Sequence, residues 1–323
     1  MWLEIICCLV IYKLIRLFFY DNQDEILQVE TSDSNASFSV AQRLEKLYGG
    51  KTYIGLRIPD ADTGSHRDID MVLVTKGEAV VISVQNMSGF VSVDASGNWV
   101  CIGNKTENFP DPVVEAKEQV SILESYLEQR GVSLPQGFLA CKVICPNPKF
   151  QIISSSNSFP PEVVTYDQWL QLKPEGKTMF SGWLKNAFQG GKKETEESIH
   201  QKLNSILSTS PMWDRLVLKG NKYLLGEFLE FKGKDDDLLL LKFVKRSKIN
   251  RVVIQMTSMF GLAPSRLQVL FKYRDYRNEG SSSALDLEEV TVRSNTEVSF
   301  LPKNSKKVRK IKLSSIISLH LSS

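Results

Sequence analysis

Residues 69–75 (IDMVLVT) and residues 79–85 (AVVISVQ) decide the fold of the first half of this chain. Both are short apolar runs rich in β-branched side chains, which is typical of buried strands. A Lys-Gly-Glu turn separates them, so together they predict a hairpin. Asp70 lies in the first strand, and Ser83 and Gln85 lie two residues apart on one face of the second.

The segments around this hairpin predict the rest of an α/β unit. Residues 36–48 place apolar side chains at helical spacing, and a Gly-Gly pair ends this helix. A second amphipathic helix is predicted at residues 112–129. Further strands are predicted at residues 51–58, 89–93, 99–102 and 139–145. Residues 35–150 therefore predict a mixed sheet flanked by helices.

The order of these elements resembles a known domain. Residues 69–74, residues 78–89 (EAVVISVQNMSG) and the Asp111-Pro112 opening of the second helix are similar to the nuclease-related domain, NERD. That domain belongs to the restriction-endonuclease-like superfamily with a PD-(D/E)xK site. The resemblance covers residues 35–150 and implies an α/β nuclease-like domain.

The resemblance also implies which positions form the catalytic site. The metal-binding Asp of the family falls on Asp70, its Glu-x-Lys pair falls on Ser83 and Gln85, and its later Gln falls on Glu115. Phosphodiester hydrolysis needs carboxylates that hold Mg²⁺ and a cation or base that orients water. Ser83 and Gln85 supply neither, so a catalytically impaired site is predicted.

An alternative rebuilds a metal site from other carboxylates. Asp68 lies two residues before Asp70 on the same face of the strand, and Glu115 approaches from the second helix. These three residues would then hold Mg²⁺ in an active endonuclease that cuts DNA or RNA. In the simpler interpretation, Asp68 belongs with His66 and Arg67 to a polar loop that enters the strand.

The N-terminus predicts a membrane anchor. Residues 2–20 are nearly all apolar and are interrupted by Glu4, Lys13 and Arg16. They are long enough to span a bilayer if the two basic side chains reach the interface. The alternatives are an amphipathic helix in the membrane plane, a cleaved signal peptide, or a core helix. Basic residues on the C-terminal side of the anchor predict that the bulk of the chain faces the cytosol.

The cysteines and glycosylation sequons bear on that orientation. The five cysteines are an odd number at scattered positions without a CxxC pair, which favours a reducing compartment over a disulfide framework or a structural zinc site. The sequons at Asn35, Asn86 and Asn104 would be glycosylated only in the reverse orientation. The net charge of +3 is too small to require a polyanionic partner.

The rest of the chain predicts a second domain of a different class. Residues 21–34 are a polar linker, and residues 151–210 predict a helical connector in which Trp169 and Leu170 pack on the first domain. Residues 211–323 predict a mainly-β domain, either a small barrel or a sandwich. Its strands are predicted at residues 223–231, 238–244, 252–257, 267–273, 289–292 and 311–321.

Two basic stretches of the second domain, Lys242–Arg251 and Lys303–Lys312, are candidate anion sites. Their candidate residues are Lys245, Arg246, Lys306, Lys307, Arg309 and Lys310. Phosphates of nucleic acid or anionic lipid headgroups are the anions that such stretches bind. Because stacking aromatic residues are sparse in both stretches, solvated hairpin loops are the simpler interpretation.

Three functional hypotheses follow from these features. The first is a membrane-anchored, catalytically impaired nuclease-like domain that acts as a binding or scaffolding module, with nucleic acid or a protein as its partner. The second is an active Mg²⁺-dependent endonuclease. The third is a lipid-surface adaptor that works through the basic β domain.

Overall fold

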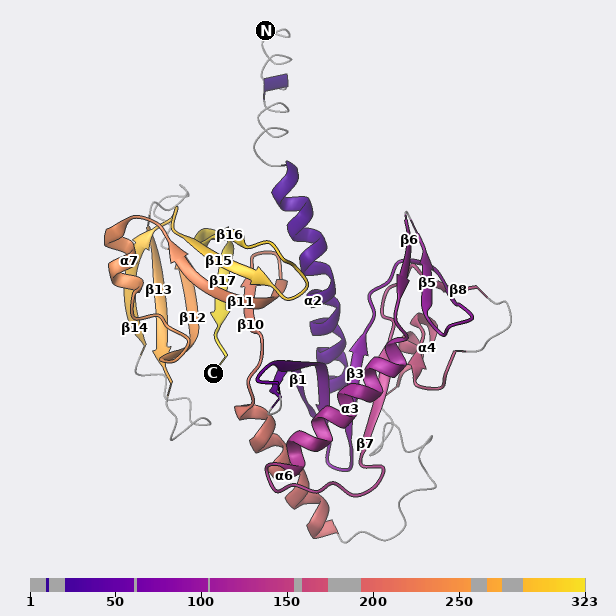
Figure 1. Ribbon diagram of the computed structural model, residues 1–323. Coiled ribbons are helices and arrows are strands. Elements are labelled where there is room, and N and C mark those ends of the chain that lie inside the picture. The colour runs from indigo at the N-terminus through magenta and orange to yellow at the C-terminus, as the bar shows by residue number, and fades with distance from the viewer. Residues whose placement is uncertain are drawn as a thin grey trace.

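The computed structural model describes residues 10–11, 21–60, 63–103, 105–153, 159–173, 193–256, 266–274 and 287–322. Figure 1 shows two lobes on either side of a long helix, α2 (Asp21–Tyr48). The first lobe is the α/β unit, and the second holds the C-terminal strands.

A five-stranded mixed sheet forms the centre of the first lobe, with strand order β1-β2-β3-β7-β9. Its strands are β1 (Lys51–Pro59), β2 (His66–Val74), β3 (Ala79–Val84), β7 (Leu139–Ile144) and β9 (Val163–Val164). The first three strands run antiparallel to one another, whereas β7 and β9 pair in parallel. The predicted mixed sheet is confirmed.

Helices cover both faces of this sheet. Besides α2, they are α3 (Pro112–Glu128), α4 (Tyr166–Gln171) and α6 (Lys193–Thr209). Val72 packs with Leu123 of α3 and Leu203 of α6, whereas its neighbour Leu73 packs with Leu44 of α2 and Trp169 of α4. Successive strand residues point to opposite faces, so the continuous apolar run of β2 feeds two cores.

A smaller four-stranded sheet extends the first lobe. It has the order β6-β5-β4-β8 and contains the predicted hairpin. Its strands are β4 (Gly89–Val93), β5 (Trp99–Ile102), β6 (Thr106–Phe109) and β8 (Phe150–Ile152). Strands β6 and β8 were not predicted, because their few residues carry little apolar alternation.

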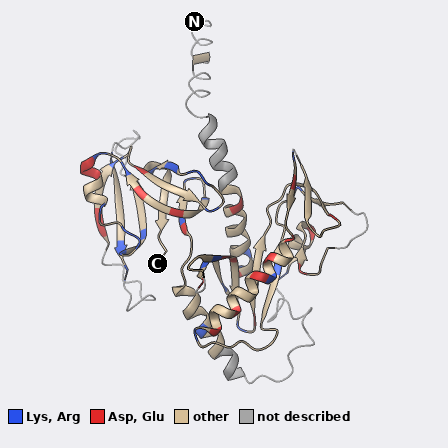
Figure 2. Cartoon of the chain, viewed as in Figure 1, with Lys and Arg blue, Asp and Glu red and all other residues tan. Residues whose placement is uncertain are grey.

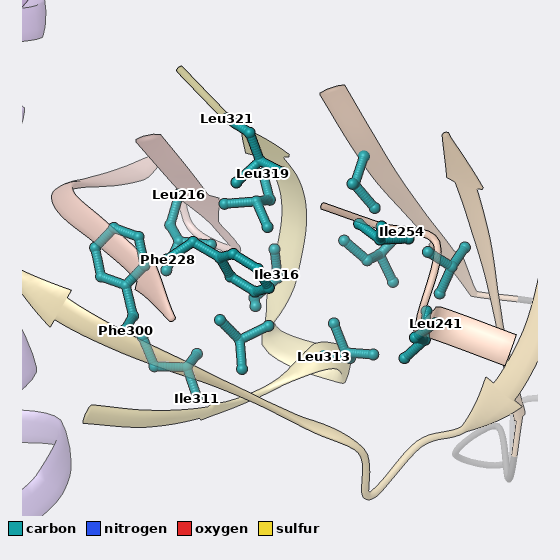
Figure 3. Close-up of a cluster of buried hydrophobic side chains, with 14 of the residues drawn as sticks. Leu216, Phe228, Leu241, Ile254, Phe300, Ile311, Leu313, Ile316, Leu319 and Leu321 are labelled. Carbon is teal, nitrogen blue, oxygen red and sulfur yellow. The ribbon is translucent and has the colours of Figure 1, made fainter. Parts of the chain in front are cut away.

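The second lobe is a curled antiparallel sheet of eight strands, in the order β14-β13-β12-β17-β10-β11-β15-β16. The strands are β10 (Asp214–Leu218), β11 (Lys222–Lys232), β12 (Ile249–Met256), β13 (Arg266–Tyr273), β14 (Glu288–Arg293), β15 (Glu297–Pro302), β16 (Arg309–Lys312) and β17 (Ile316–His320). Figure 3 shows Leu216, Phe228, Phe300 and Leu319 converging from different strands on one core. The predicted barrel or sandwich is therefore a half-barrel with edges at β14 and β16.

Several predicted elements of the second lobe differ from the structure. Residues 238–244 were predicted as a strand, but Asp235–Leu241 form helix α7, which has three Asp residues in its first turn. Carboxylates in that position stabilise a helix through its dipole, and the apolar run hid this signal. Residues 311–321 are divided between β16, a 3-10 turn and β17. The prediction also missed β10 and β15.

The segment predicted as a polar linker, residues 21–34, forms the first half of α2. Tertiary contacts with the second lobe hold its end. Ser34 Oγ accepts a hydrogen bond from Leu225 N at 3.3 Å, and Asn35 Oδ1 accepts one from Tyr223 N at 2.7 Å. The Phe38 ring stacks on Tyr223 with 4.4 Å between centroids. Such contacts override a weak local helix propensity.

The connector and the N-terminus give mixed outcomes. Trp169 is buried as predicted, but Leu170 is 52% exposed because it lies on the outer side of the short helix α4. Within the described part of the chain, no helix has both the length and the apolar character to cross a membrane. The predicted anchor, residues 2–20, lies outside the described residues except for residues 10 and 11.

Candidate functional site

The register of β2 and β3 places the three predicted catalytic positions together. Val72 lies opposite Val81, so two residues further along Asp70 faces Ser83. Ser83 Oγ donates a hydrogen bond to Asp70 Oδ2 at 3.2 Å, and Gln85 Nε2 donates to Ser83 Oγ at 3.0 Å. The three side chains form a short relay that ends on the Asp70 carboxylate.

The second lobe supplies a fourth side chain to this site. Lys303, which directly follows β15, donates a hydrogen bond from Nζ to Asp70 Oδ1 at 2.8 Å. The Lys303 side chain is 21% exposed and that of Asp70 is 33% exposed. The two residues lie 233 positions apart, and the sequence marked Lys303 only as a member of a basic stretch. Sequence reasoning therefore missed it as a site residue.

The pairing of β11 with β15 fixes the backbone position of Lys303. Its N–H donates to Leu225 O at 2.9 Å, next to Gly226 of β11, which pairs with Pro302 of β15. A Cβ atom at Gly226 would lie 2.1 Å from the carbonyl oxygen of Leu301, so only glycine allows the two strands this close approach. Lys303 is thus held at its base as well as at its ammonium group.

Helix α3 contributes to the other side of the site. Asp70 N donates to Gln119 Oε1 at 3.1 Å. Asp111 caps the helix by accepting a hydrogen bond from Val113 N, as the Asp-Pro opening indicates. The resemblance placed the family's later Gln on Glu115. The side chain of α3 that bonds to Asp70 is instead Gln119, which lies one helical turn further along the same face.

Three carboxylates and one ammonium group interact in this region. Burial lowers the pKa of Lys303, but the charge and hydrogen bond of Asp70 and the charges of Asp68 and Glu115 together raise it above its ordinary value. Burial raises the pKa of Asp68 against the attraction of Lys303 and Arg57. Burial raises the pKa of Glu115 as well, and the negative charge of Asp70 adds to that effect.

The predicted metal ligands do not form a site that fits Mg²⁺. Both oxygens of Asp70 are already engaged, one by Lys303 and the other by Ser83. In the part of the chain that the structure describes, no three acidic, histidine or cysteine side chains gather closely enough to hold a metal ion. Asp68 lies in β2 rather than in a loop, yet it does not complete a metal site with Asp70 and Glu115.

A cleft opens beside the site between the two lobes. It has a volume of about 1530 Å³, and Asp70, Gln85 and Lys303 line part of it. Lys105 and Lys149 line it from the four-stranded sheet. Phe90 and Ile102 of the same sheet are 52% and 44% exposed and add apolar surface to the cleft. Asp33 and Glu107 also line the cleft, which therefore offers cationic, acidic, amide and apolar groups to a ligand.

The predicted anion-binding residues divide into two groups. Arg246 bonds to Asp214 and Glu227, so it serves the second lobe internally. Lys245 is exposed, as are Lys306, Lys307 and Lys310 around β16, and Arg309 is partly buried. Figure 2 shows acidic and basic residues interspersed over both lobes. Arg246 is thus engaged by two carboxylates, whereas Lys306, Lys307 and Lys310 are exposed to solvent.

The comparison with protein families agrees with the geometry of the first lobe. The model of the nuclease-related domain, NERD, matches residues 32–145, which include Asp70, Ser83, Gln85 and most of the sheet beneath them. No curated protein and no solved structure matches the chain. Residues 32–145 of this chain therefore form a nuclease-related domain, NERD.

Proposed function

We propose that the nuclease-related domain of this chain is catalytically impaired and that the chain acts as a membrane-tethered binding module. The observation that carries this proposal is that protein side chains already bond to both carboxylate oxygens of Asp70. Its carboxylate receives hydrogen bonds from Lys303 and Ser83, and the position of the Glu-x-Lys lysine is held by the uncharged Gln85.

The chemistry of hydrolysis supports impairment. Metal-assisted cleavage requires carboxylates that bind a divalent cation and a group that orients the attacking water. The Ser83 hydroxyl donates to Asp70 and accepts from Gln85, so its proton and an oxygen lone pair are already used. Because Gln85 and Ser83 bond to each other, neither is positioned to replace the lost acid and cation.

Lys303 itself favours one alternative, an active endonuclease with a composite site. Gln85 stands at the motif position of the lysine and carries no charge. The second lobe instead places the Lys303 ammonium 2.8 Å from Asp70 Oδ1. In that case Lys303 would offset the charge that develops on the phosphate. The alternative still requires a metal-binding donor set, which the described residues do not assemble.

Nuclease assays test the proposal. The purified full chain is incubated with plasmid DNA, single-stranded DNA and RNA in Mg²⁺ or Mn²⁺, beside Asp70→Asn and Lys303→Ala. Asp167→Asn, which changes an exposed Asp of α4, is the matched control. We expect no metal-dependent cutting by any of the four proteins. Cutting that is lost in Asp70→Asn and kept in Asp167→Asn would contradict impairment, and its loss in Lys303→Ala would favour the composite site.

Nucleic acid held without cleavage is the ligand that we propose for the cleft. Support comes from Lys105 and Lys149, which provide cations for phosphates, and from the exposed ring of Phe90, which offers a stacking surface. Fluorescence anisotropy with labelled single-stranded RNA and DNA in EDTA measures this binding. We expect Lys105→Glu with Lys149→Glu to weaken it and to reduce its salt dependence. The exposed lysines around β16 give the control, Lys306→Glu with Lys310→Glu.

Two features support a tether whose folded part faces the cytosol. Helix α2 begins at Asp21, directly after the apolar stretch. Asn35 and Asn86 are sequons, yet both side chains bond within the fold, Asn35 to Tyr223 and Asn86 to Ser32. A glycan at Asn35 would crowd the contact between the lobes. We expect the chain to fractionate with membranes and to show no mobility shift with an endoglycosidase, and a deletion of residues 2–20 to release it.

A further inference from the structure

The acidic residues of the nuclease-related site need a positive charge near them. Asp68 and Asp70 lie two residues apart on one face of β2, and Glu115 of α3 lies within electrostatic range of Asp70, so their negative charges repel one another. In a metal-dependent nuclease, a divalent cation relieves this repulsion. Here the described residues do not fit a metal, and both Asp70 oxygens are engaged by protein groups.

The positive charge comes from Lys303, which is unlike a mobile surface lysine. Its side chain is 21% exposed, its ammonium group lies 2.8 Å from Asp70 Oδ1, and its backbone N–H is bonded to Leu225 O at 2.9 Å. Leu225 N in turn donates to Ser34 Oγ of α2. This series of hydrogen bonds connects α2, β11 and Lys303 to Asp70.

We propose that the Lys303 ammonium is a tethered cation that takes the place of the metal ion in this nuclease-related site. The second lobe thereby supplies the positive charge that balances Asp70 in the first lobe, and the site needs no metal ion for this balance. This inference rests on the proposed impairment and names its cause. It also gives the C-terminal half-barrel a definite role, because it carries the residue that occupies the site.

The contact geometry agrees with a monovalent occupant. The Lys303 ammonium lies 2.8 Å from Asp70 Oδ1, and the Ser83 hydroxyl donates to Asp70 Oδ2 at 3.2 Å, so each oxygen of this carboxylate has a protein donor. The single positive charge of Lys303 therefore balances the single negative charge of the carboxylate that it contacts.

Metal rescue of a lysine variant tests the proposal. Thermal unfolding of the purified full chain in mild detergent is followed by tryptophan fluorescence in EDTA, Mn²⁺ or ethylammonium chloride. Lys303→Ala removes the tethered cation and leaves room for a free one. Lys306→Ala, an exposed lysine of the same loop, is the matched control. Lys303→Gln keeps the side-chain length without the charge and serves if the alanine variant fails to fold.

We expect the wild type to unfold at the same temperature in EDTA and in Mn²⁺. Lys303→Ala should unfold about 2–4 °C lower in EDTA, and Mn²⁺ or ethylammonium should recover much of that loss. The recovery should disappear in the double variant Lys303→Ala with Asp70→Asn. Lys306→Ala should behave as the wild type does.

Two results would overturn the proposal. If neither cation stabilises Lys303→Ala or Lys303→Gln, Lys303 is only a contact between the lobes. If Mn²⁺ stabilises the wild type and this effect needs Asp70, metal and lysine occupy the site together. The nuclease assay remains separate from both results, because cutting by the wild type contradicts impairment, whereas failed rescue without cutting contradicts only the tethered cation.

Discussion

Two ion pairs of this molecule, Asp214–Arg246 and Asp70–Lys303, show how the same chemistry serves different purposes. The Asp214 side chain is 1% exposed and accepts hydrogen bonds from Phe228 N at 2.7 Å and Ser322 N at 2.8 Å, besides its bond to Arg246. The Asp70 side chain is 33% exposed and is held by the side chains of Lys303 and Ser83. It also lines the cleft between the lobes.

The difference lies in the kind of partner. Backbone N–H groups cannot leave Asp214 unless β11 or the C-terminal end of the chain moves, so this pair is part of the scaffold of the second lobe. The partners of Asp70 are side chains, which a substitution can remove without moving the backbone that carries them. Side-chain partners beside a cleft mark a site that has kept the geometry of a binding centre.

Breaking the scaffold pair should have the largest effect. Arg246→Met leaves the Asp214 carboxylate buried without its cation, and we expect the free energy of unfolding to fall by about 3–5 kcal/mol. Urea denaturation measures this change, with Lys245→Met as the control at an exposed neighbouring position. A loss below about 1 kcal/mol, the usual value for an exposed pair, would remove the distinction between the two pairs.

Separating the strands that place Lys303 should have the next largest effect. In Gly226→Ala the new Cβ would lie 2.1 Å from Leu301 O and 2.7 Å from Phe300 Cε1, so β11 and β15 must move apart. We expect a loss of about 1–3 kcal/mol in urea denaturation. Gly77→Ala is the matched control, because its Cβ would meet no atom within 4 Å. Equal stability of the two variants would show that the close approach is not required.

The sequence predicted the first lobe well because its signals are local. The hairpin of β2 and β3, the Asp-Pro opening of α3 and the glycines that end α2 are each contained in a few neighbouring residues. These signals placed Asp70, Ser83 and Gln85 in one site, and the hydrogen bonds among them are present. The motif positions were predictable because strand register follows from the turn between the strands.

The contribution of the second lobe to the site, Lys303, was not predictable in this way. Lys303 reaches Asp70 across 233 residues, and its placement depends on the packing of α2 against β11 and on the glycine at position 226. Helix α7 is likewise held by tertiary contacts that the sequence does not show, including those of Asp237 with Arg293 and Thr296. Contacts between distant segments leave no periodic signal in a single sequence.

A double-mutant cycle measures the Asp70–Lys303 pair directly. We expect Asp70→Asn and Lys303→Met to be coupled by about 1 kcal/mol in the free energy of unfolding, well below the effect of breaking the Asp214 pair, because both side chains retain contact with solvent. Urea denaturation of the two single variants, the double variant and the wild type gives the coupling energy. Additive single effects would show that the pair contributes no interaction of its own to stability.

The smallest predicted effect concerns a titratable group in the second lobe. His320 lies opposite Arg215 and Arg251 on the neighbouring strands. Burial, and then the two positive charges, lower the pKa of His320 from 6.5 to about 3. Between these two pKa values, His320 is protonated in the unfolded chain and neutral in the folded chain. The folded state is therefore most stable, with respect to this group, above pH 6.5, and it loses stability as the pH falls toward 3.

Between pH 7 and pH 6 this linkage should lower the free energy of unfolding by about 0.7 kcal/mol. His320→Gln removes the titrating group, so the stability of this variant should change less over the same interval, measured by urea denaturation at each pH. An equal slope in the two proteins would show that His320 does not titrate differently in the folded state. Because His320 lies in the half-barrel and Lys303 belongs to the site, the same variant should leave the response of Lys303→Ala to Mn²⁺ unchanged. A changed response would mean that the stability of the half-barrel controls how firmly Lys303 holds Asp70. The Asp214–Arg246 and Asp70–Lys303 pairs would then both belong to the scaffold and would differ only in their contribution to stability.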